Sequence, residues 1–290
     1  MRLPGENFAT GQLCMPQALE VITGLVTAPG AVLTALTMQN GGSATVRNAA
    51  LTSKIGLIDT WAFNNAAGIW QIRSPKLHDN VQGNRYRIPA ADPSSLVVPG
   101  LWQRLIPQDN LTLNLSGSAV GGQIEQGFLQ IYYTDLPGAA SRLIGIQELM
   151  QRTVNMWTTE VDVAPGAAGG FSGQVAINST FDQFKANTDY ALIGAQVDTI
   201  CGGVRVVSPD FANLGVGIPG ILASRWPTER YFYHLTQHLN IPLIPVFNLA
   251  NKQGTLVDVA QNQAAAAVKV VLYLHELSMP NGAQPQPALV

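Results

Sequence analysis

The chain has 290 residues, a formal net charge of −2 and 12% charged residues, against about 25% in an average protein. No cluster of Lys and Arg exists, so the sequence lacks the electrostatic footprint of a nucleic-acid-binding protein, and we expect no direct contact with nucleic acid. A surface this poor in charge favours assembly with other subunits, because interface cores are depleted in charged residues.

In chain order, residues 1–17 have no convincing period and are expected to form an N-terminal arm. Short alternating apolar runs then predict strands, which are separated by turns rich in Gly, Pro and Asn. In the first half we expect two strands within 19–36 and further strands at 54–61, 68–73, 111–115 and 127–135. Residues 76–99 are expected to be a long loop.

The segment 141–156 is expected to be a connecting helix, with Ser141 as its N-cap and an apolar face that includes Leu149. Beyond it we expect strands at 158–163, 171–178, 190–199, 204–207, 241–249, 255–260 and 268–277. A short helix capped by Ser179 or Thr180 is expected to continue through 181–185, and a longer helix to span 226–239. Residues 280–290 read as a C-terminal tail.

One strand occurs twice, about half the chain apart. Residues 127–137, GFLQIYYTDLP, return as 268–277, VKVVLYLHEL, with Tyr132 aligned on Tyr273. Five further short matches keep the same order: Ala28-Pro29-Gly30-Ala31 with Ala164-Pro165-Gly166-Ala167, Ile55-Gly56 with Ile193-Gly194, Ile58-Asp59-Thr60 with Val197-Asp198-Thr199, Ser74-Pro75 with Ser208-Pro209, and Ile106-Pro107 with Ile241-Pro242. Ordered repetition at nearly the same spacing predicts two copies of one domain.

The sequence therefore predicts an all-β protein made of two tandem jelly-roll domains, each a β-sandwich or barrel, with a few short helices. The predicted division is an arm at 1–17, a first domain at 18–140, a connecting helix at 141–156, a second domain at 157–279 and a tail at 280–290.

The strongest metal candidate is the pair His234 and His238, four residues apart on the predicted helix at 226–239. The pair lacks the Glu of an HExxH motif, and no third ligand is indicated. We therefore expect both side chains to pack or to form hydrogen bonds, and we expect no metal.

No catalytic constellation emerges. Ser172 misses the spacing of a nucleophile elbow. Asp59 and Asp198 align in the two copies, which favours a structural role such as a hydrogen bond to a turn over a pair of catalytic carboxylates. The tryptophans are dispersed and are expected to anchor cores or interfaces: Trp61, Trp70, Trp102, Trp157 and Trp226. We expect no enzymatic activity and no cofactor.

The remaining signals concern redox state and location. Cys14 and Cys201 form neither a CxxC pair nor a disulfide-dense pattern, so we expect both thiols to be reduced. No apolar run of about 18 residues is present for a membrane-spanning helix. The first residues lack the charged start and apolar run of a signal peptide, so we expect no export.

The repeated APGA, IDT/VDT, SP, IP and Tyr-x-x-acid-Leu elements, set in two consecutive β domains, resemble the organisation of the major capsid proteins of tailless icosahedral viruses with an internal membrane. Those proteins are double jelly rolls, or stacked barrels in phages of thermophilic bacteria, and the tandem repeat favours the side-by-side form. The resemblance implies a capsid subunit located in the virion and made in the host cytoplasm. It also implies pseudo-hexameric trimers that contact other capsid proteins and the membrane below.

Two other classes of protein stay open. A two-domain β-sandwich binding module, such as a carbohydrate-binding or adhesin-like protein, would use aromatic loops, but export would then be expected. An enzyme on a β scaffold, such as a glycan lyase, is disfavoured because the catalytic constellation is missing. A fold alone does not decide among these classes.

Overall fold

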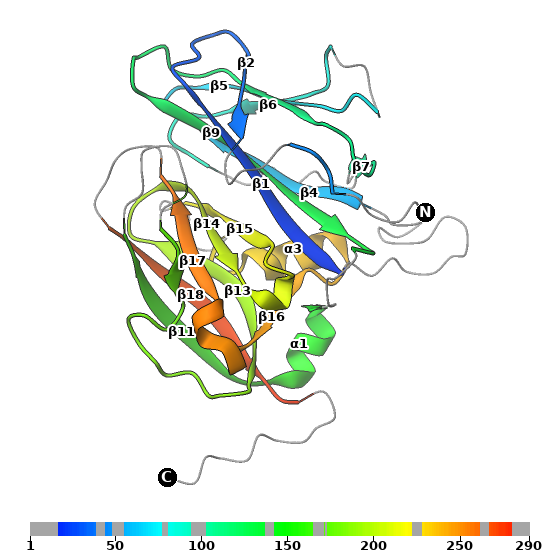
Figure 1. Ribbon diagram of the computed structural model, residues 1–290, viewed down its shortest axis with the longest axis vertical. Coiled ribbons are helices and arrows are strands. Elements are labelled where there is room, and N and C mark those ends of the chain that lie inside the picture. The colour runs from blue at the N-terminus through cyan, green and yellow to red at the C-terminus, as the bar shows by residue number, and fades with distance from the viewer. Residues whose placement is uncertain are drawn as a thin grey trace, which may run out of the picture.

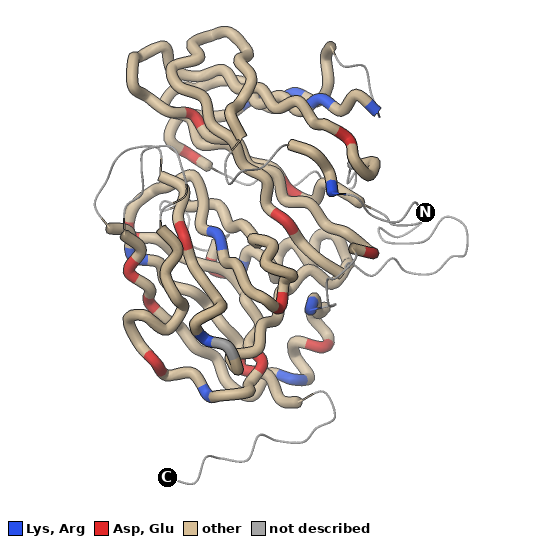
Figure 2. The backbone as a smooth tube through the Cα atoms, in the orientation of Figure 1, with Lys and Arg blue, Asp and Glu red and all other residues tan. Residues whose placement is uncertain are grey.

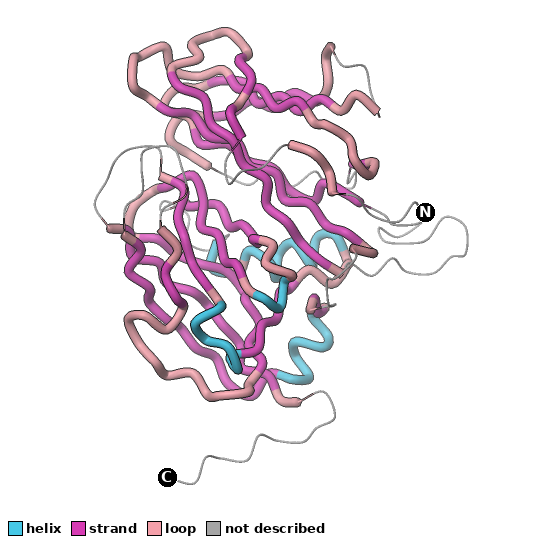
Figure 3. Tube along the Cα trace, viewed as in Figure 1, coloured by secondary structure: helices cyan, strands magenta, loops and turns pink. Residues whose placement is uncertain are grey.

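The computed structural model describes residues 17–38, 44–47, 55–76, 81–93, 103–136, 142–164, 171, 173–221, 228–261 and 267–279. The described strands form four sheets that pair into two sandwiches, drawn one above the other in Figure 1. Charged positions are sparse along the whole described chain (Figure 2). All of the described helical segments accompany the second sandwich, drawn lower in Figure 3.

The first sandwich is built from the strands of the first half of the chain. They are β1 (Ala18–Thr27), β2 (Thr34–Ala35), β3 (Thr37–Met38), β4 (Ile55–Phe63), β5 (Gly68–Arg73), β6 (Asn84–Ile88), β7 (Gln103–Leu105), β8 (Thr112–Leu115) and β9 (Ile124–Tyr133). One sheet has the order β3-β1-β9-β4-β7 and the other the order β2-β8-β5-β6.

The antiparallel pairs in this sandwich are nested. The first long strand β1 pairs with the last strand β9, β2 pairs with β8, β4 with β7 and β5 with β6. The chain is therefore one long hairpin of four successive pairs, rolled so that alternate pairs lie in opposite sheets. This arrangement of eight strands in two sheets is a jelly roll.

The second sandwich follows the same plan. Its elements are β10 (Leu143–Ile144), α1 (Ile146–Arg152), β11 (Thr153–Val163), β12 (Val175–Ala176), β13 (Asp189–Val197), β14 (Cys201–Val207), η1 (Pro209–Phe211), β15 (Gly215–Gly220), α3 (Tyr231–Leu239), β16 (Ile244–Asn248), η2 (Leu249–Gly254), β17 (Leu256–Ala260) and β18 (Val268–Leu277). The nested pairs are β11 with β18, β12 with β17, β13 with β16 and β14 with β15. The predicted fold, all-β with two tandem jelly rolls, is confirmed.

The strand registers also confirm the alignment of the two copies. Gly56 in β4 lies opposite Tyr132 in β9, and Gly194 in β13 lies opposite Tyr273 in β18. A Cβ on Gly56 would lie 2.3 Å from the Tyr132 ring, so this glycine leaves room for the tyrosine. The two Ser-Pro elements likewise follow equivalent strands, β5 and β14.

In two of the predicted sequence matches, the aligned residues do not occupy equivalent positions in the two rolls. Asp59 lies inside β4 opposite Gln130, whereas Asp198 lies in the turn after β13. A bulge between Leu57 and Asp59 shifts the register of β4, so a match in sequence is not a match in position. The two Ile-Pro elements also differ, because the first follows β7 and the second precedes β16.

The predicted helix at 141–156 is shorter in the structure. Helix α1 covers Ile146–Arg152, and β11 begins at Thr153 because this β-branched residue already pairs with Leu277 of β18. Val154 lies at a bulge, and the pairing resumes at Asn155. Ser141, its predicted cap, lies outside the described residues. The segment is not only a connector, because β10 pairs with β16 at the edge of the second roll.

Three further predictions differ from the structure. No helix follows Ser179, since the chain runs extended while Phe184 packs edge-on against Tyr190. The helix predicted at 226–239 is interrupted: Thr228 and Glu229 are helical, Arg230 is a turn, and α3 continues from Tyr231. The predicted loop at 76–99 contains strand β6. Most of the arm and all of the tail, 1–16 and 280–290, lie outside the described residues.

Replacing Gly194 by alanine tests how closely β13 packs against the segment that precedes α3 in the second roll. A Cβ there would lie 2.0 Å from the backbone oxygen of Thr228, so we expect a loss of about 1–3 kcal/mol in the free energy of unfolding, measured in urea. Gly173→Ala is the matched control, because nothing lies within 4 Å of the added carbon. Equal stability of the two variants would contradict the packing described.

Candidate functional site

The defining surface of the molecule is the outer face of the first roll's larger sheet. Strands β4 and β9 are buried along their whole length on both faces. Leu129, Ile131 and Tyr133 point into the core of the first roll, whereas Phe128 and Tyr132 belong to the core cluster of the second roll. The second roll therefore covers this sheet, and β1, β9 and β4 cross between the two sandwiches in Figure 1.

Trp61 of β4 is the largest side chain in this contact between the rolls. Its ring stacks on Phe128, with centroids 5.1 Å apart and planes 6° from parallel, and its Nε1 donates a hydrogen bond of 2.8 Å to the carbonyl of Gly202. Glycines in β14 and β15 permit the approach. A Cβ on Gly202 would lie 2.8 Å from the Phe128 ring, and one on Gly217 would lie 2.7 Å from Val21.

Polar groups at the same contact pair across it. The amide of Gly217 donates to Gln130 Oε1 at 3.0 Å, and Gln126 Nε2 donates to the carbonyl of Gln261 at 3.1 Å. Such bonds matter because a buried polar group without a partner costs about 1–3 kcal/mol. The two rolls are therefore joined by hydrogen bonds as well as by apolar packing.

Tyr231 of α3 completes the contact. Its hydroxyl donates a 2.6 Å hydrogen bond to Oδ2 of the fully buried Asp59. Burial and the nearby Asp59 charge raise the pKa of Tyr231 well above its usual value, so the phenol stays protonated and remains a donor. Asp59 thus has a structural role, as predicted for it, but toward a helix of the other roll instead of a turn.

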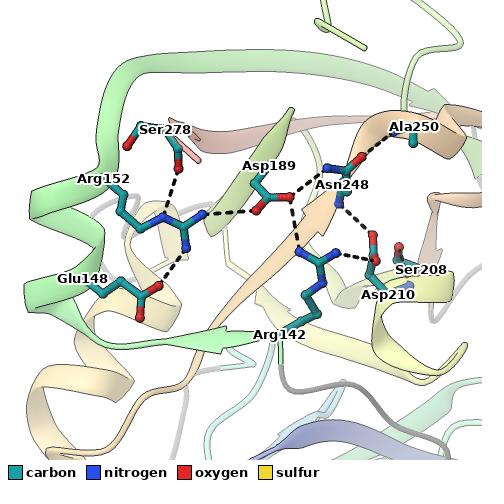
Figure 4. A network of polar contacts seen from close by, with 9 residues as sticks. All are labelled: Arg142, Glu148, Arg152, Asp189, Ser208, Asp210, Asn248, Ala250 and Ser278. Carbon is teal, nitrogen blue, oxygen red and sulfur yellow. Dashed lines mark hydrogen bonds and ion pairs between the residues drawn. The ribbon is translucent and has the colours of Figure 1, made fainter. Parts of the chain in front are cut away.

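A second polar network fixes the segment between the rolls to the second roll (Figure 4). Asp189 of β13 accepts bonds from Arg142 and Arg152, both at 3.2 Å, and from Asn248 at 2.9 Å. Arg142 also reaches Asp210, at 3.5 Å. Because Arg152 and Asp189 are only 12% and 9% exposed, water screens their ion pair less than one at the surface. The network holds both ends of α1 against the sheet.

The outer face of the second roll's larger sheet is not covered by the other roll, unlike the equivalent face of the first roll. A groove of about 450 Å³ runs between α1, α3 and strands β11 and β18. Aromatic side chains line it, among them Trp157, Tyr233 and Tyr273. Met150 and Met156 at its edge are 69% and 72% exposed. In the isolated chain this face is open to solvent.

The histidine candidates lie on α3 as predicted. His234 is half-buried, with its ring edge-on to Tyr233, and His238 is exposed. Burial, followed by the charge of Arg230, lowers the pKa of His234. Within the described ranges, no group of three or more His, Cys, Asp or Glu side chains is placed to hold a metal ion.

The other candidates have structural surroundings. Trp61 and Trp70 are fully buried, and Trp157 Nε1 donates to Glu276 Oε2 at 2.7 Å. Asp198 is exposed and accepts a bond from the amide of Lys269 at 3.0 Å. Three of the residues singled out in the sequence lie outside the described residues: Trp102, Ser172 and Trp226.

Cys201 is a buried free thiol, and burial raises its pKa to about 12. A thiol with so high a pKa stays protonated at neutral pH and packs as a small apolar group. Cys14 lies outside the described residues. Of the helices described, none is long and apolar enough to span a bilayer.

Sequence reasoning missed the contact between the rolls. The alternation of β9 placed Gln130 and Tyr132 on one face, which is the pattern of a strand with a solvated side. The available signal was the doublet Gly202-Gly203, since glycine inside a strand marks a close approach of another segment.

No family model matches the chain, and no curated protein matches its sequence. Among solved structures, the chain is similar to the PBSX exported protein XepA, with 10% identity, 95% of this chain and 94% of that chain covered, and a TM-score of 0.26. It is also similar to a chain of Sulfolobus Turreted Icosahedral Virus (10% identity, 92% of each chain, TM-score 0.22) and to Momordica charantia 7S globulin (10% identity, 90% of this chain and 70% of that chain, TM-score 0.19). TM-scores this low carry no argument, so the architecture rests on the strand order itself.

Replacing Tyr231 by phenylalanine tests the polar contact between the rolls. The change removes a donor from the buried Asp59 carboxylate, and we expect the free energy of unfolding in urea to fall by about 1–3 kcal/mol. Tyr233→Phe on the same helix is the control, because Tyr233 is only half-buried and lines the open groove. If both variants were as stable as the wild type, the hydrogen bond from Tyr231 to Asp59 would not contribute to the stability of the fold.

Proposed function

We propose that the chain is a structural protein, the major capsid subunit of an icosahedral viral shell, and has no catalytic role. One observation carries the proposal: two complete jelly rolls of identical strand nesting are packed together by a buried sheet face. Jelly rolls occur in viral capsid and lectin domains. A subunit that tiles a shell benefits from a rigid pair of similar units, because each unit offers a similar edge to its neighbours.

The pair of rolls suits a trimer. Two near-equivalent units in each chain give three chains six similar corners, so a trimer approximates a hexagonal tile. We propose this pseudo-hexameric trimer as the building unit, with the rolls side by side as domains 18–140 and 157–279 and with 141–156 between them. Closed cyclic assemblies of this kind are the usual form of homo-oligomers.

The surface composition supports assembly. Only 12% of the residues are charged, and Figure 2 shows long stretches of backbone that carry no charge. The exposed apolar side chains Met150, Val154 and Met156 gather near the open groove. An apolar patch with few charges is typical of a surface that another protein covers.

The remaining partners belong to the same proposal. The arm 1–17 and the tail 280–290 would tie subunits to neighbours, to other capsid proteins or to an internal membrane beneath the shell. The protein would be made in the host cytoplasm and located in the virion, as in the tailless icosahedral viruses that it resembles, including phages of thermophilic bacteria. No direct contact with nucleic acid belongs to this role.

A second candidate function has one specific observation in its favour. The groove of about 450 Å³ lined by Trp157, Tyr233 and Tyr273 has the size and aromatic lining of a small ligand site. A two-domain β-sandwich binding module that takes a carbohydrate would use such a groove. The capsid proposal accounts for both rolls and for the low charge, whereas the binding module accounts for the groove alone.

Light scattering on the purified chain, combined with electron microscopy of the same sample, tests the function. We expect a mass of three chains or a larger regular array, because each isolated chain leaves the outer sheet face of β11 and β18 uncovered. A stable monomer at all concentrations would contradict the shell role. Glycan binding that Tyr233→Ala abolishes would then support the binding module.

A further inference from the structure

We infer that the open outer face of β11 and β18 binds the outer face of β5, β6 and β8 in a second copy of this chain. This contact between two chains would have the same geometry as the contact between the two rolls of one chain. The inference rests on the proposed function, since it requires that copies assemble, and it names the two surfaces that meet.

The receiving face is identified by register. In the first roll, Val21 lies opposite Gln130; in the second, Glu160 lies opposite Val271. Because Tyr132 and Tyr273 are equivalent, Val21 and Glu160 occupy the same position on the same sheet face. Val21 is 7% exposed beneath the second roll, but Glu160 is only half-buried.

The same contrast holds along the strands. Leu19 and Phe128 are 1% and 0% exposed, whereas Thr158 and Lys269, their equivalents by register, are exposed. Met156 lies opposite His275 on this same face and is 72% exposed. One roll thus has its outer sheet face covered, and the other roll has the equivalent face open.

The covering surface is also identified by register. Within the chain, Gly217 of β15 lies against Val21 and opposite Arg205. In the first roll Arg85 of β6 lies opposite Gln71. The strand pairs β14 with β15 and β5 with β6 are equivalent, so Arg85 occupies the position of Gly217.

Further pairs agree with this alignment. Arg205 lies opposite Asp258 in the second roll, with Nε donating to Oδ1 at 2.9 Å, and Gln71 lies opposite Asn114 in the first. The outer surface of β5, β6 and β8 in the first roll is therefore the counterpart of the surface that covers Val21.

These two alignments together predict one specific ion pair. Within the chain Gly217 meets Val21, so between chains Arg85 should meet Glu160. Asp162 and Arg87 extend the same charge pattern, since each lies two residues further along its strand. Arg85 and Arg87 are exposed in the isolated chain, and β6 is marked by basic residues in Figure 2. The receiving face carries Glu160 and Asp162 around the single Lys269, with which both acids pair. These three groups keep a net negative charge, which complements the arginines of the covering face.

The contact joins two different surfaces, so it is a head-to-tail contact. Each chain uses one surface to bind the chain before it and the other surface to bind the chain after it. Such a contact closes into a ring or continues as an open filament. A ring of three chains would contain six rolls, which is the trimer proposed above. The charge pair at this contact would keep single chains soluble before they assemble, whereas the matching positions inside the chain are Val and Gly.

The test is a charge exchange in the full chain. We expect Arg85→Glu alone and Glu160→Arg alone each to weaken association at least about tenfold in sedimentation equilibrium, since like charges would then face each other. The double variant should regain most of the lost affinity, because the pair is restored with its charges exchanged. Lys252→Glu on η2, a reversal of the same size away from both faces, is the control and should associate as the wild type does.

The outcomes separate the two proposals. Single variants that associate as the wild type does, or a double variant as weak as the singles, would overturn the inference while the wild-type oligomer upholds the shell role. A wild type that stays monomeric would overturn both. Urea unfolding midpoints within the error of the wild type, measured on each variant, exclude misfolding as the cause of weak association, because Glu160 also pairs with Lys269 within the chain.

Discussion

The structure depends on the burial of both faces of β4 and β9. A sheet in a sandwich normally packs one face on its core and leaves the other to water. Here the second face packs on the neighbouring roll through Trp61, Phe128 and Tyr132. Several of the polar groups that this burial removes from water form hydrogen bonds across the contact, as Tyr231 does with Asp59. The two rolls are therefore packed together through a shared buried interface.

Comparing the two rolls position by position shows how one fold serves two environments. Where the sheet face is covered within the chain, its residues are apolar or small, such as Val21 and Gly217. At the equivalent open positions the residues are charged, such as Glu160 and Arg85. A duplicated domain can thus keep its strand nesting while each copy adapts its outer faces to a partner in the same chain or in another chain.

Much of the fold could be predicted because strands repeat with a period of two and turns are marked by Gly and Pro. The tandem repeat followed from short matches such as Ser74-Pro75 with Ser208-Pro209. The errors have physical causes: a bulge displaced Asp59 from its match, and the glycines and proline of β15 hid a strand at 215–220. The contact between the rolls could not be predicted, since alternation does not show whether a polar face meets water or protein.

A structure of the assembled oligomer, determined by electron cryomicroscopy, would test whether the contact between the rolls within a chain recurs between neighbouring chains. We expect that the rotation relating the first roll to the second within a chain also relates the second roll to the first roll of the next chain. The face of β11 and β18 would then be covered. An oligomer in which that face stays open to solvent, or meets its own copy across a two-fold axis, would contradict the account.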